Sequence, residues 1–185
     1  NETRKKEAKK LPITSGATTV RGDFLERNHI QGNSSANNSR IGLEDESGRL
    51  FALMTGVILD GEFHLNRYAS LLHHNVRGGF TKILHFITKK YKGNITRITT
   101  FSDNMITIGN LYSANGFHVY KIIPPDYQYV VNGNRVHKFN YRKSRFKKDD
   151  GLLYHENYTE SQLADINHLY RVWDAGKIKW DMEIL

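Results

Sequence analysis

Two adjacent glycines, Gly78 and Gly79, stand where the sequence could build a binding site for a phosphate. Apolar side chains follow them at the spacing of an α-helix, at Phe80, Ile83, Leu84, Ile87 and Tyr91. A helix that begins at this pair exposes backbone N–H groups in its first turn, where anions bind. The candidate binding residues are Arg77, Gly78, Gly79, Phe80 and Thr81. The alternative is a tight turn that only lets the helix pack closely on a strand.

Arg67 and Asp103 are a second pair of chemical interest. In the predicted strand 62–72, alternation places Leu65 and Arg67 on one face and Asn66 and Tyr68 on the other. A buried arginine needs a carboxylate or an anionic ligand, because an unpaired buried charge is costly. Asp103 follows the next predicted strand, 97–101, and could form a salt bridge with Arg67. It could equally act as a base or orient a substrate amine.

Histidines offer further candidates. His29 follows a predicted helix at 20–28 and opens a polar loop, so it either hydrogen-bonds locally or serves as acid, base or ligand. His73 and His74 are neighbours whose side chains would point apart on a strand, and no other cluster has metal-ligand spacing. The chain has no cysteine, so thiolate ligands and disulfides are excluded. We therefore expect no metal site.

The order of elements predicts an α/β (α+β) fold. Strands at 40–44, 49–59 and 62–72 follow one another with short turns, which is typical of an antiparallel meander. The helix after Gly79 then leads to the strand 97–101, so a βαβ crossover follows the meander. Residues 103–116 are predicted to be helical, with Ile108, Leu111 and Tyr112 on one face, before a strand at 118–123.

This series resembles the GNAT acyltransferase family, whose second core motif has a short helix ending in Tyr-x-x-x-Gly-Phe, here Tyr112 to Phe117. The resemblance implies a mixed, largely antiparallel sheet with a crossover helix. It also implies that the glycine turn holds the pyrophosphate of acetyl-CoA or a related acyl donor, and that Tyr112 protonates the departing thiolate. The glycine motif of the family is only partly present, with Asn75 at its first position and Phe80 at its last.

A longer series of segments resembles a bacteriophage domain found at the C-terminus of homing-endonuclease-like proteins, and more distantly the Mom-type DNA-modification proteins. The resemblance runs from about Phe24 to Trp180 and includes the ending Trp-Asp-x-Gly-x-x-Lys-Trp at 173–180. It rests on segments 24–32, 45–48, 65–68, 78–82, 102–103 and 109–112. DNA is the partner that it implies.

Charge also favours a nucleic-acid partner. The net charge is +8 with a pI of about 9.6, and a predicted hairpin at 131–136 leads into a basic segment that contains aromatic residues. The candidate DNA contacts are Arg135, Lys138, Arg142, Lys143, Arg145, Lys147 and Lys148. The alternative is a solvated basic face with Phe139 and Phe146 in the core. A helix capped by Thr159 is then expected over 161–173.

The domain organisation follows from composition. Residues 1–10 carry no apolar side chain larger than alanine and are expected to be a basic tail or linker. Residues 11–185 are expected to form one domain, with a core at about 20–131 and a basic extension at 132–185. No apolar run is long enough to cross a membrane, and the chain begins with no signal-peptide pattern. We therefore expect a cytoplasmic protein, in a bacterial host cell if a phage encodes it.

Three functions fit these observations. The first is a transferase that modifies a base or amine in phage DNA, with catalytic candidates Tyr112, Asp103 and His29. The second is a non-catalytic DNA-binding accessory domain of a homing-endonuclease-like protein. The third is a conventional N-acyltransferase that acts on a protein or small amine.

Overall fold

The computed structural model describes residues 4–16, 19–34 and 38–184, and the chain divides into two compact units. The first unit consists of Asn1–Phe101, Gly109–Lys121 and Lys179–Leu185, and the second of Ser102–Ile108 and Ile122–Ile178. This division falls inside the stretch expected to be one domain. The second unit begins its main segment at Ile122 rather than 132, and the last residues return to the first unit.

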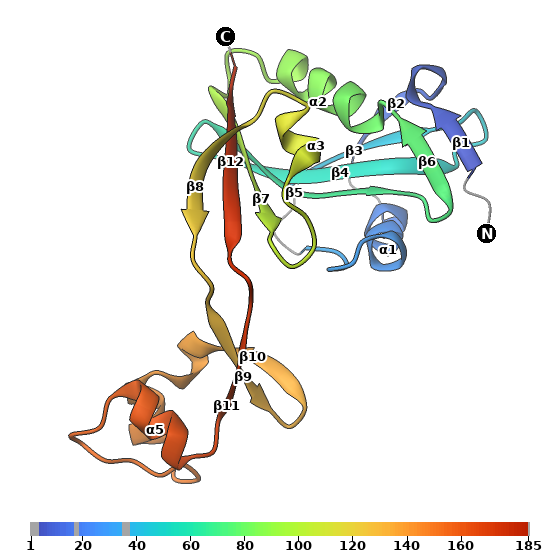
Figure 1. Cartoon of the computed structure of the whole chain (residues 1–185). Coiled ribbons are helices and arrows are strands. Elements are labelled where there is room, and N and C mark those ends of the chain that lie inside the picture. The colour runs from blue at the N-terminus through green and yellow to red at the C-terminus, as the bar shows by residue number, and fades with distance from the viewer. Residues whose placement is uncertain (1–3, 17–18, 35–37, 185) are drawn as a thin grey trace. The chain divides into compact units, whose positions relative to one another are not determined.

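The central feature of the first unit is a seven-stranded sheet (Figure 1). In sheet order its strands are β2 (Ile13–Ser15), β3 (Ser39–Glu44), β4 (Leu50–Leu59), β5 (Glu62–Ser70), β7 (Arg97–Asp103), β12 (Lys177–Glu183) and β8 (His118–Ile123). Strands β2 to β5 pair antiparallel, whereas β5 and β7 are parallel. The expected meander and crossover are therefore confirmed. The last strand, β12, inserts between β7 and β8.

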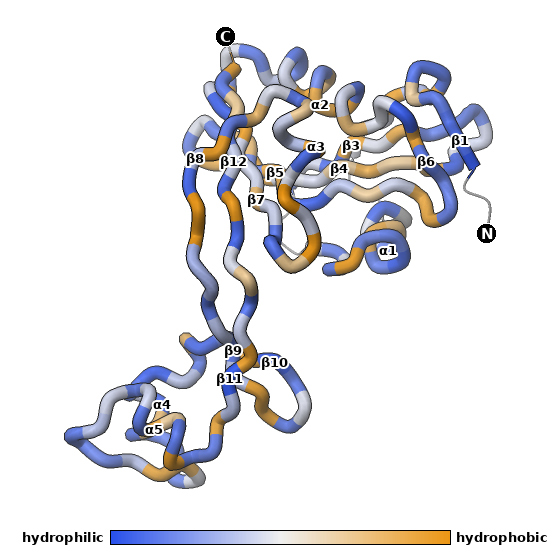
Figure 2. Tube along the Cα trace, in the orientation of Figure 1, coloured by the Kyte–Doolittle hydropathy of each residue, from blue (hydrophilic) through white to orange (hydrophobic). Residues whose placement is uncertain are grey.

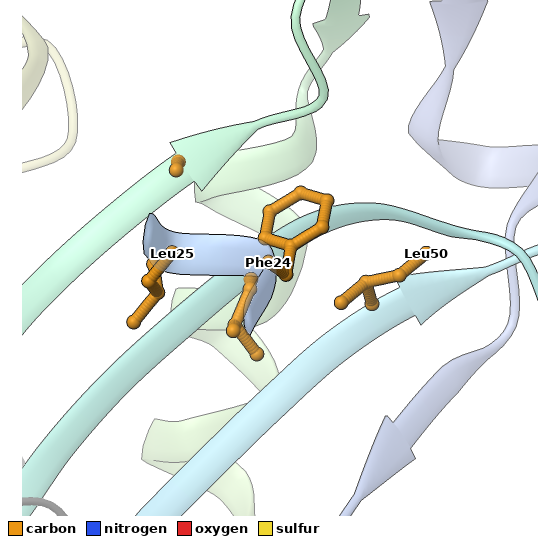
Figure 3. Packing of buried hydrophobic residues seen from close by; sticks show 5 residues of the cluster. Phe24, Leu25 and Leu50 are labelled. Atoms are coloured by element: carbon orange, nitrogen blue, oxygen red, sulfur yellow. The ribbon is translucent and has the colours of Figure 1, made fainter. Parts of the chain in front are cut away.

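Helices cover both faces of this sheet (Figure 1). Helix α2 (Gly79–Lys90) begins at the predicted residue and buries its apolar stripe, and two lysines in its last turn suit the negative end of the helix dipole. On the other face, α1 (Thr19–Asn28) packs Phe24 and Leu25 against the sheet residues Leu50, Leu53 and Ala69 (Figure 3). Figure 2 shows hydrophobic colouring along β4, where residues 50–54 are buried. Among the described residues, no helix has the length and apolar character needed to cross a membrane.

The N-terminal segment is part of this unit, so the prediction of a tail is wrong for the described residues 4–10. Strand β1 (Arg4–Glu7) pairs parallel with β6 (His74–Arg77), and a 3₁₀ turn follows at Ala8–Lys10. Ala8 is 3% exposed, and the Lys82 ammonium donates to the carbonyl oxygens of Ala8 and Leu11 at 3.0 and 2.8 Å. Backbone groups hold this segment in place, and hydropathy does not record them.

Two predicted helices are shorter than expected. In the region 103–116, only α3 (Asn110–Ser113) is helical, and Ile108 lies outside it with 70% exposure. The helix expected over 161–173 is α5 (Glu160–Ile166), which ends before His168, a residue with φ of 53°. Tyr170–Trp173 instead forms the strand β11. The predicted cap at Thr159 is confirmed, since its side chain and Gln162 form a capping box.

The second unit has its own small sheet and core. Strand β9 (Tyr127–Val131) lies between β10 (Asn134–His137) and β11, and the predicted hairpin turns at Asn132 and Gly133, both with positive φ. The 3₁₀ helix η2 (Lys138–Tyr141) and α4 (Lys143–Lys148) follow. With α5 they enclose a core of Tyr129, Tyr141, Phe146, Leu163 and Ala164.

Arg21 joins the edge of the large sheet to α1 through a buried ion pair. The residue is 5% exposed, and its guanidinium lies 2.9 Å from the Glu44 carboxylate. The guanidinium also donates to the Thr14 hydroxyl at 2.6 Å and to the carbonyl oxygens of Gly16 and Arg40 at 3.0 and 2.9 Å. Both terminal nitrogens of the guanidinium therefore meet acceptors, which offsets the cost of burying the charge.

We predict that Arg21→Met lowers the free energy of unfolding by about 3 kcal/mol, because it leaves the Glu44 carboxylate without its cation. Urea denaturation followed by circular dichroism measures the change. Arg27→Met, at an exposed position of the same helix, should change stability by less than about 0.5 kcal/mol. Equal stability of both variants would contradict a stabilising role for the Arg21 pair.

Candidate active site

The N-terminus of α2 has the features of an anion site, and the Tyr68 hydroxyl lies beside it. Gly78 has φ of 71°, no side chain caps the helix there, and a Cβ on Gly78 would meet no atom within 4 Å. A Cβ on Gly79 would lie 2.7 Å from the Tyr68 hydroxyl. That hydroxyl accepts a hydrogen bond from the backbone N–H of Phe80, and burial raises the pKa of Tyr68 above its ordinary value. A neutral hydroxyl therefore occupies one N–H group of the first turn, which the sequence did not indicate.

The other predicted cofactor residues have defined positions. The Thr81 hydroxyl donates to the Asn115 side chain at 2.6 Å, which ties α2 to the turn after α3. Phe80 is buried, and its ring contacts those of Tyr68 and Tyr112 at centroid distances of 5.1 and 5.9 Å. Arg77 is exposed, and its backbone pairs with Glu7. The Thr81 and Phe80 side chains therefore have contacts within the chain, and the binding of a donor at this turn stays a prediction.

The ladder between β5 and β7 is short. The two strands pair over Glu62–His64 and Arg97–Thr99, although β5 continues to Ser70 and β7 to Asp103. One further contact joins them, because the Thr100 hydroxyl donates to the Leu65 carbonyl oxygen at 3.1 Å. Past this point β7 no longer occupies the edge of β5. Strand edges released in this way can take up an extended ligand by main-chain hydrogen bonds.

Tyr112 lies beside β7, just after the ladder between β5 and β7 ends. Gly109, with φ of 81°, precedes α3, and Tyr112 packs in an aromatic cluster with Phe80, Phe117 and Trp180. Its hydroxyl lies 3.5 Å from the carbonyl oxygen of Phe101, the residue after Thr100. A hydrogen bond of this length is weak. The ring contacts thus fix the position of the phenol, and its role as an acid stays a prediction.

A β-bulge corrects the predicted orientation of Arg67. Thr55 pairs with Arg67 and Gly56 pairs with Leu65, so Asn66 is an extra residue in β5. Leu65 and Arg67 therefore point to opposite faces of the sheet, contrary to simple alternation. Arg67 shares its face with Ala69, which packs against α1. Tyr68 points the other way, toward Phe80 of α2.

Arg67 lies beneath the turn that follows α1. The Arg67 guanidinium donates to the carbonyl oxygens of Gly32 and Asn66, at 3.4 and 2.8 Å. Within the first unit, no described carboxylate lies within ion-pair distance of it. Asp103, its expected partner, instead accepts a hydrogen bond from the backbone N–H of Met105 at 3.0 Å. The structure thus gives Asp103 a local role at the end of β7, and its catalytic role stays a prediction.

His29 belongs to the same turn. The backbone N–H of Gly32 donates to the His29 carbonyl oxygen at 2.9 Å, and the backbone N–H of Gln31 donates to Nδ1 at 3.1 Å. Partial burial lowers the pKa of His29 below its ordinary value, and the charge of Arg67 lowers it further. A neutral ring whose Nδ1 accepts carries its proton on Nε2. In the neutral ring, His29 would therefore have a hydrogen-bond donor at Nε2, and its catalytic role stays a prediction.

Electrostatics connects three of these residues. The charge of Arg67 acts on His29, and the pKa of Arg67 is lowered by burial and raised by Tyr112. Tyr112 and His29 were predicted from the sequence. Arg67 was noticed there only as a charge that needed a partner, and Tyr68 gave no signal beyond its place in a strand.

The basic residues of the second unit differ in their contacts. Lys138 forms an ion pair with Asp126 at 2.6 Å, Arg145 pairs with Asp149 at 3.3 Å, and the Lys143 ammonium donates to the Glu156 carbonyl oxygen. The remaining four are exposed and form no ion pair with described residues of this unit. We call them the basic cluster: Arg135, Arg142, Lys147 and Lys148.

Aromatic rings accompany these charges. Phe146 is 1% exposed and belongs to the core, whereas Phe139 is 59% exposed, with the Arg142 guanidinium 4.4 Å from its ring centre. A pocket of about 310 Å³ lies beside this pair, lined by Tyr127, Tyr129, Lys138, Phe139, Arg142 and Glu160. The alternative of a basic face with both phenylalanines in the core is therefore wrong for Phe139.

Comparison with known proteins gives the fold class. No protein-family model matches the sequence, and no curated protein sequence matches it. The ribosomal-protein-S18-alanine N-acetyltransferase from Escherichia coli matches in structure with a TM-score of 0.56 at 13% identity, over 94% of this chain and 93% of that chain. A GNAT family acetyltransferase from Elizabethkingia anophelis with acetyl-CoA bound has a TM-score of 0.56 at 13% identity, over 94% and 98%.

An acetyltransferase from Bacillus subtilis in complex with CoA also matches, with a TM-score of 0.55 at 13% identity over 95% of this chain and 99% of that one. The chain therefore has the fold of GNAT-family acetyltransferases, and the predicted fold class is confirmed. The relation to bacteriophage and Mom-type proteins stays a prediction.

We predict that stability depends on pH through His29. Its pKa is lower in the folded chain, so its contribution is complete above about pH 6.5 and is lost as pH falls through the folded pKa. Protonation would also remove the acceptor of the Gln31 N–H. Unfolding at pH 7.5 and 5.5 should show a larger loss for the wild type than for His29→Asn. The same loss in both proteins would exclude this assignment.

Proposed function

We propose that this chain is an acyl-CoA-dependent N-acyltransferase. The observation that carries the proposal is the position of the Tyr112 hydroxyl beside Phe101, immediately after the ladder between β5 and β7 ends. The N-terminus of α2, where Gly78 provides no side-chain cap, belongs to the same unit and follows β5 in the chain. Two similar structures were crystallised with acetyl-CoA or CoA, which supports the same donor class here.

The residues present fit such a donor. At the start of the 12-residue helix α2, Gly78 provides no side-chain cap, and a Cβ on Gly78 would meet no atom within 4 Å. The Tyr68 hydroxyl occupies the N–H of Phe80 in the first turn. Backbone N–H groups there would hold phosphate oxygens. Tyr68 does not oppose this, because its raised pKa keeps the hydroxyl uncharged. The released edge of β5 beyond Leu65 would hold the extended arm of the donor by main-chain hydrogen bonds.

The chain's own groups then have distinct roles. The donor supplies an acyl group on a thioester: the amine nitrogen bonds to the acyl carbon, the carbon–sulfur bond breaks, and the amine loses a proton to solvent or a base. Tyr112 gives its proton to the departing sulfur, as its weak hydrogen bond permits. His29 orients the acceptor with its Nε2–H. Asp103 remains the proposed base.

We also propose that DNA carries the acceptor amine. The support is the basic cluster, which has no carboxylate partner in its own unit, together with the exposed Phe139 beneath Arg142. Exposed rings and arginines suit base stacking and phosphate contact. A conventional N-acyltransferase acting on a protein or small amine fits the fold equally. An accessory DNA-binding domain without activity is the remaining alternative.

We predict that Tyr112→Phe lowers kcat about 100-fold, because the departing thiolate loses its proton donor. Thiol release from acetyl-CoA, assayed with amines and with DNA, measures the rate. The KM for acetyl-CoA should not change. Tyr120→Phe is the matched control, since Tyr120 is 56% exposed on β8. Asp103→Asn tests the proposed base, and an unchanged rate in that variant would remove Asp103 from the site.

We predict that replacing Arg142, Lys147 and Lys148 by alanine weakens DNA binding and lowers the salt dependence of the binding constant by about two to three phosphate contacts. Fluorescence anisotropy with a labelled duplex at several salt concentrations measures both. The control variant replaces Lys89, Lys92 and Lys121, which are exposed and change the net charge equally. If both variants bind equally well, the basic cluster does not contact DNA, whereas the acyl-transfer proposal stands.

A further inference from the structure

The arginines Arg21, Arg97 and Arg67 are buried or partly buried and differ in their hydrogen-bond partners. Arg21 has the Glu44 carboxylate at 2.9 Å, and Arg97 has the carboxylates of Asp181 and Glu183 at 3.3 and 3.5 Å. Arg67 is also partly buried, but its described contacts are two backbone carbonyl oxygens. Carbonyl oxygens carry only partial charge. Among the described residues of the first unit, no carboxylate therefore pairs with the charge of Arg67.

Two groups near Arg67 bear on whether it binds a ligand: the Glu26 carboxylate and the Thr55 hydroxyl. On α1, the carboxylate of Glu26 lies beside Gly32 and accepts a hydrogen bond from the backbone N–H of Asn33 at 3.0 Å. It holds the loop and does not pair with Arg67. Directly opposite Arg67 on β4, the Thr55 hydroxyl is buried and has no hydrogen-bond partner among the described residues. A cation and an unsatisfied hydroxyl thus lie side by side on one face of the sheet.

The bulge at Asn66 decides which face of the sheet Arg67 and Tyr68 each occupy. It turns Arg67 toward α1 and the His29 turn, and turns Tyr68 toward α2, where the acyl donor is proposed to bind. Arg67 therefore lies on the face opposite the donor helix, beside the end of the β5–β7 ladder and within electrostatic range of Tyr112. This is the side from which an acceptor would approach.

We infer that Arg67 binds an anionic group of the acceptor, a carboxylate or a phosphate, and so selects acceptors that carry negative charge close to the reacting amine. The guanidinium has the planar fork that fits either group, and its two carbonyl contacts fix its direction. This inference rests on the proposed acyl transfer for its meaning, although anion binding itself can be measured without it.

Titration of the full chain, labelled with ¹⁵N, tests the binding directly. Sodium acetate and inorganic phosphate are added separately while the Nε–H resonances of the arginines are followed, and Arg67→Gln assigns the Arg67 signal. The Arg67 signal should move and saturate with at least one anion, and the anion with the lower half-saturation identifies the group. The signals of Arg21 and Arg97, which already have carboxylates, should not move. An Arg67 signal that moves no more than that of exposed Arg27 overturns the inference.

Pairs of acceptors that differ only in negative charge test whether Arg67 selects anionic acceptors. Glycine is compared with glycinamide, and deoxycytidine monophosphate with deoxycytidine, in acyl transfer from acetyl-CoA. Arg67→Gln should lower kcat/KM for the charged member of the accepted pair about 10- to 100-fold, mainly through KM, and leave the neutral member nearly unchanged. Equal loss for both members overturns selection by Arg67. If Arg67 binds anions but the wild type transfers to no acceptor in any assay, the acyl-transfer proposal fails and the anion site stands.

Discussion

The short ladder between β5 and β7 is the constraint on which the site depends. The parallel pair joins Glu62–His64 to Arg97–Thr99, and the opposite neighbour of β7 in the sheet is β12. Strand β7 thus stays paired with β12 on one side of the sheet, while it separates from β5 on the other. The carbonyl oxygen that meets Tyr112 belongs to Phe101, just beyond this release. The proposed donor edge, the Tyr112 hydroxyl and the face of Arg67 therefore all lie beside the point where these two strands separate.

The sequence predicted the elements whose signal is local. The helix after Gly79, the meander and the hairpin at Asn132-Gly133 follow from side-chain period and turn residues, and all are present. The orientation of Arg67 could not be predicted, because a bulge depends on how two strands register and one extra residue reverses every following side chain. The docking of β1 was missed for a related reason. Its support comes from backbone pairing with β6 and from Lys82, and composition reports neither.

The predicted helix ends were wrong where pairing with a distant strand outweighed the helical spacing of apolar residues. The stripe expected over 161–173 includes Tyr170, yet β9 offers β11 a strand partner, and the chain leaves the helix at His168. Asp103 illustrates the same limit at the site. As a carboxylate at a strand end it could have paired with Arg67, but a local backbone N–H satisfies it. Tyr112 could be named as a candidate because its helix, the stop glycine and the following phenylalanine are contiguous in sequence. The face occupied by Arg67 and His29 is instead assembled from separate segments.

The proposals give positive charge two purposes in this chain, and the chemistry of the proposed acceptor connects them. The basic cluster is exposed and suits a long polyanion, since each charge there would release a counterion from phosphate. Arg67 is partly buried, so it suits one anionic group that accepts several hydrogen bonds in a fixed direction. A nucleic acid carries many phosphates, so its chemistry suits both kinds of charge. A small amino acid would satisfy only Arg67, and the basic cluster would then serve a separate partner. The preference of Arg67 for phosphate or carboxylate therefore bears on whether the two units act on the same substrate.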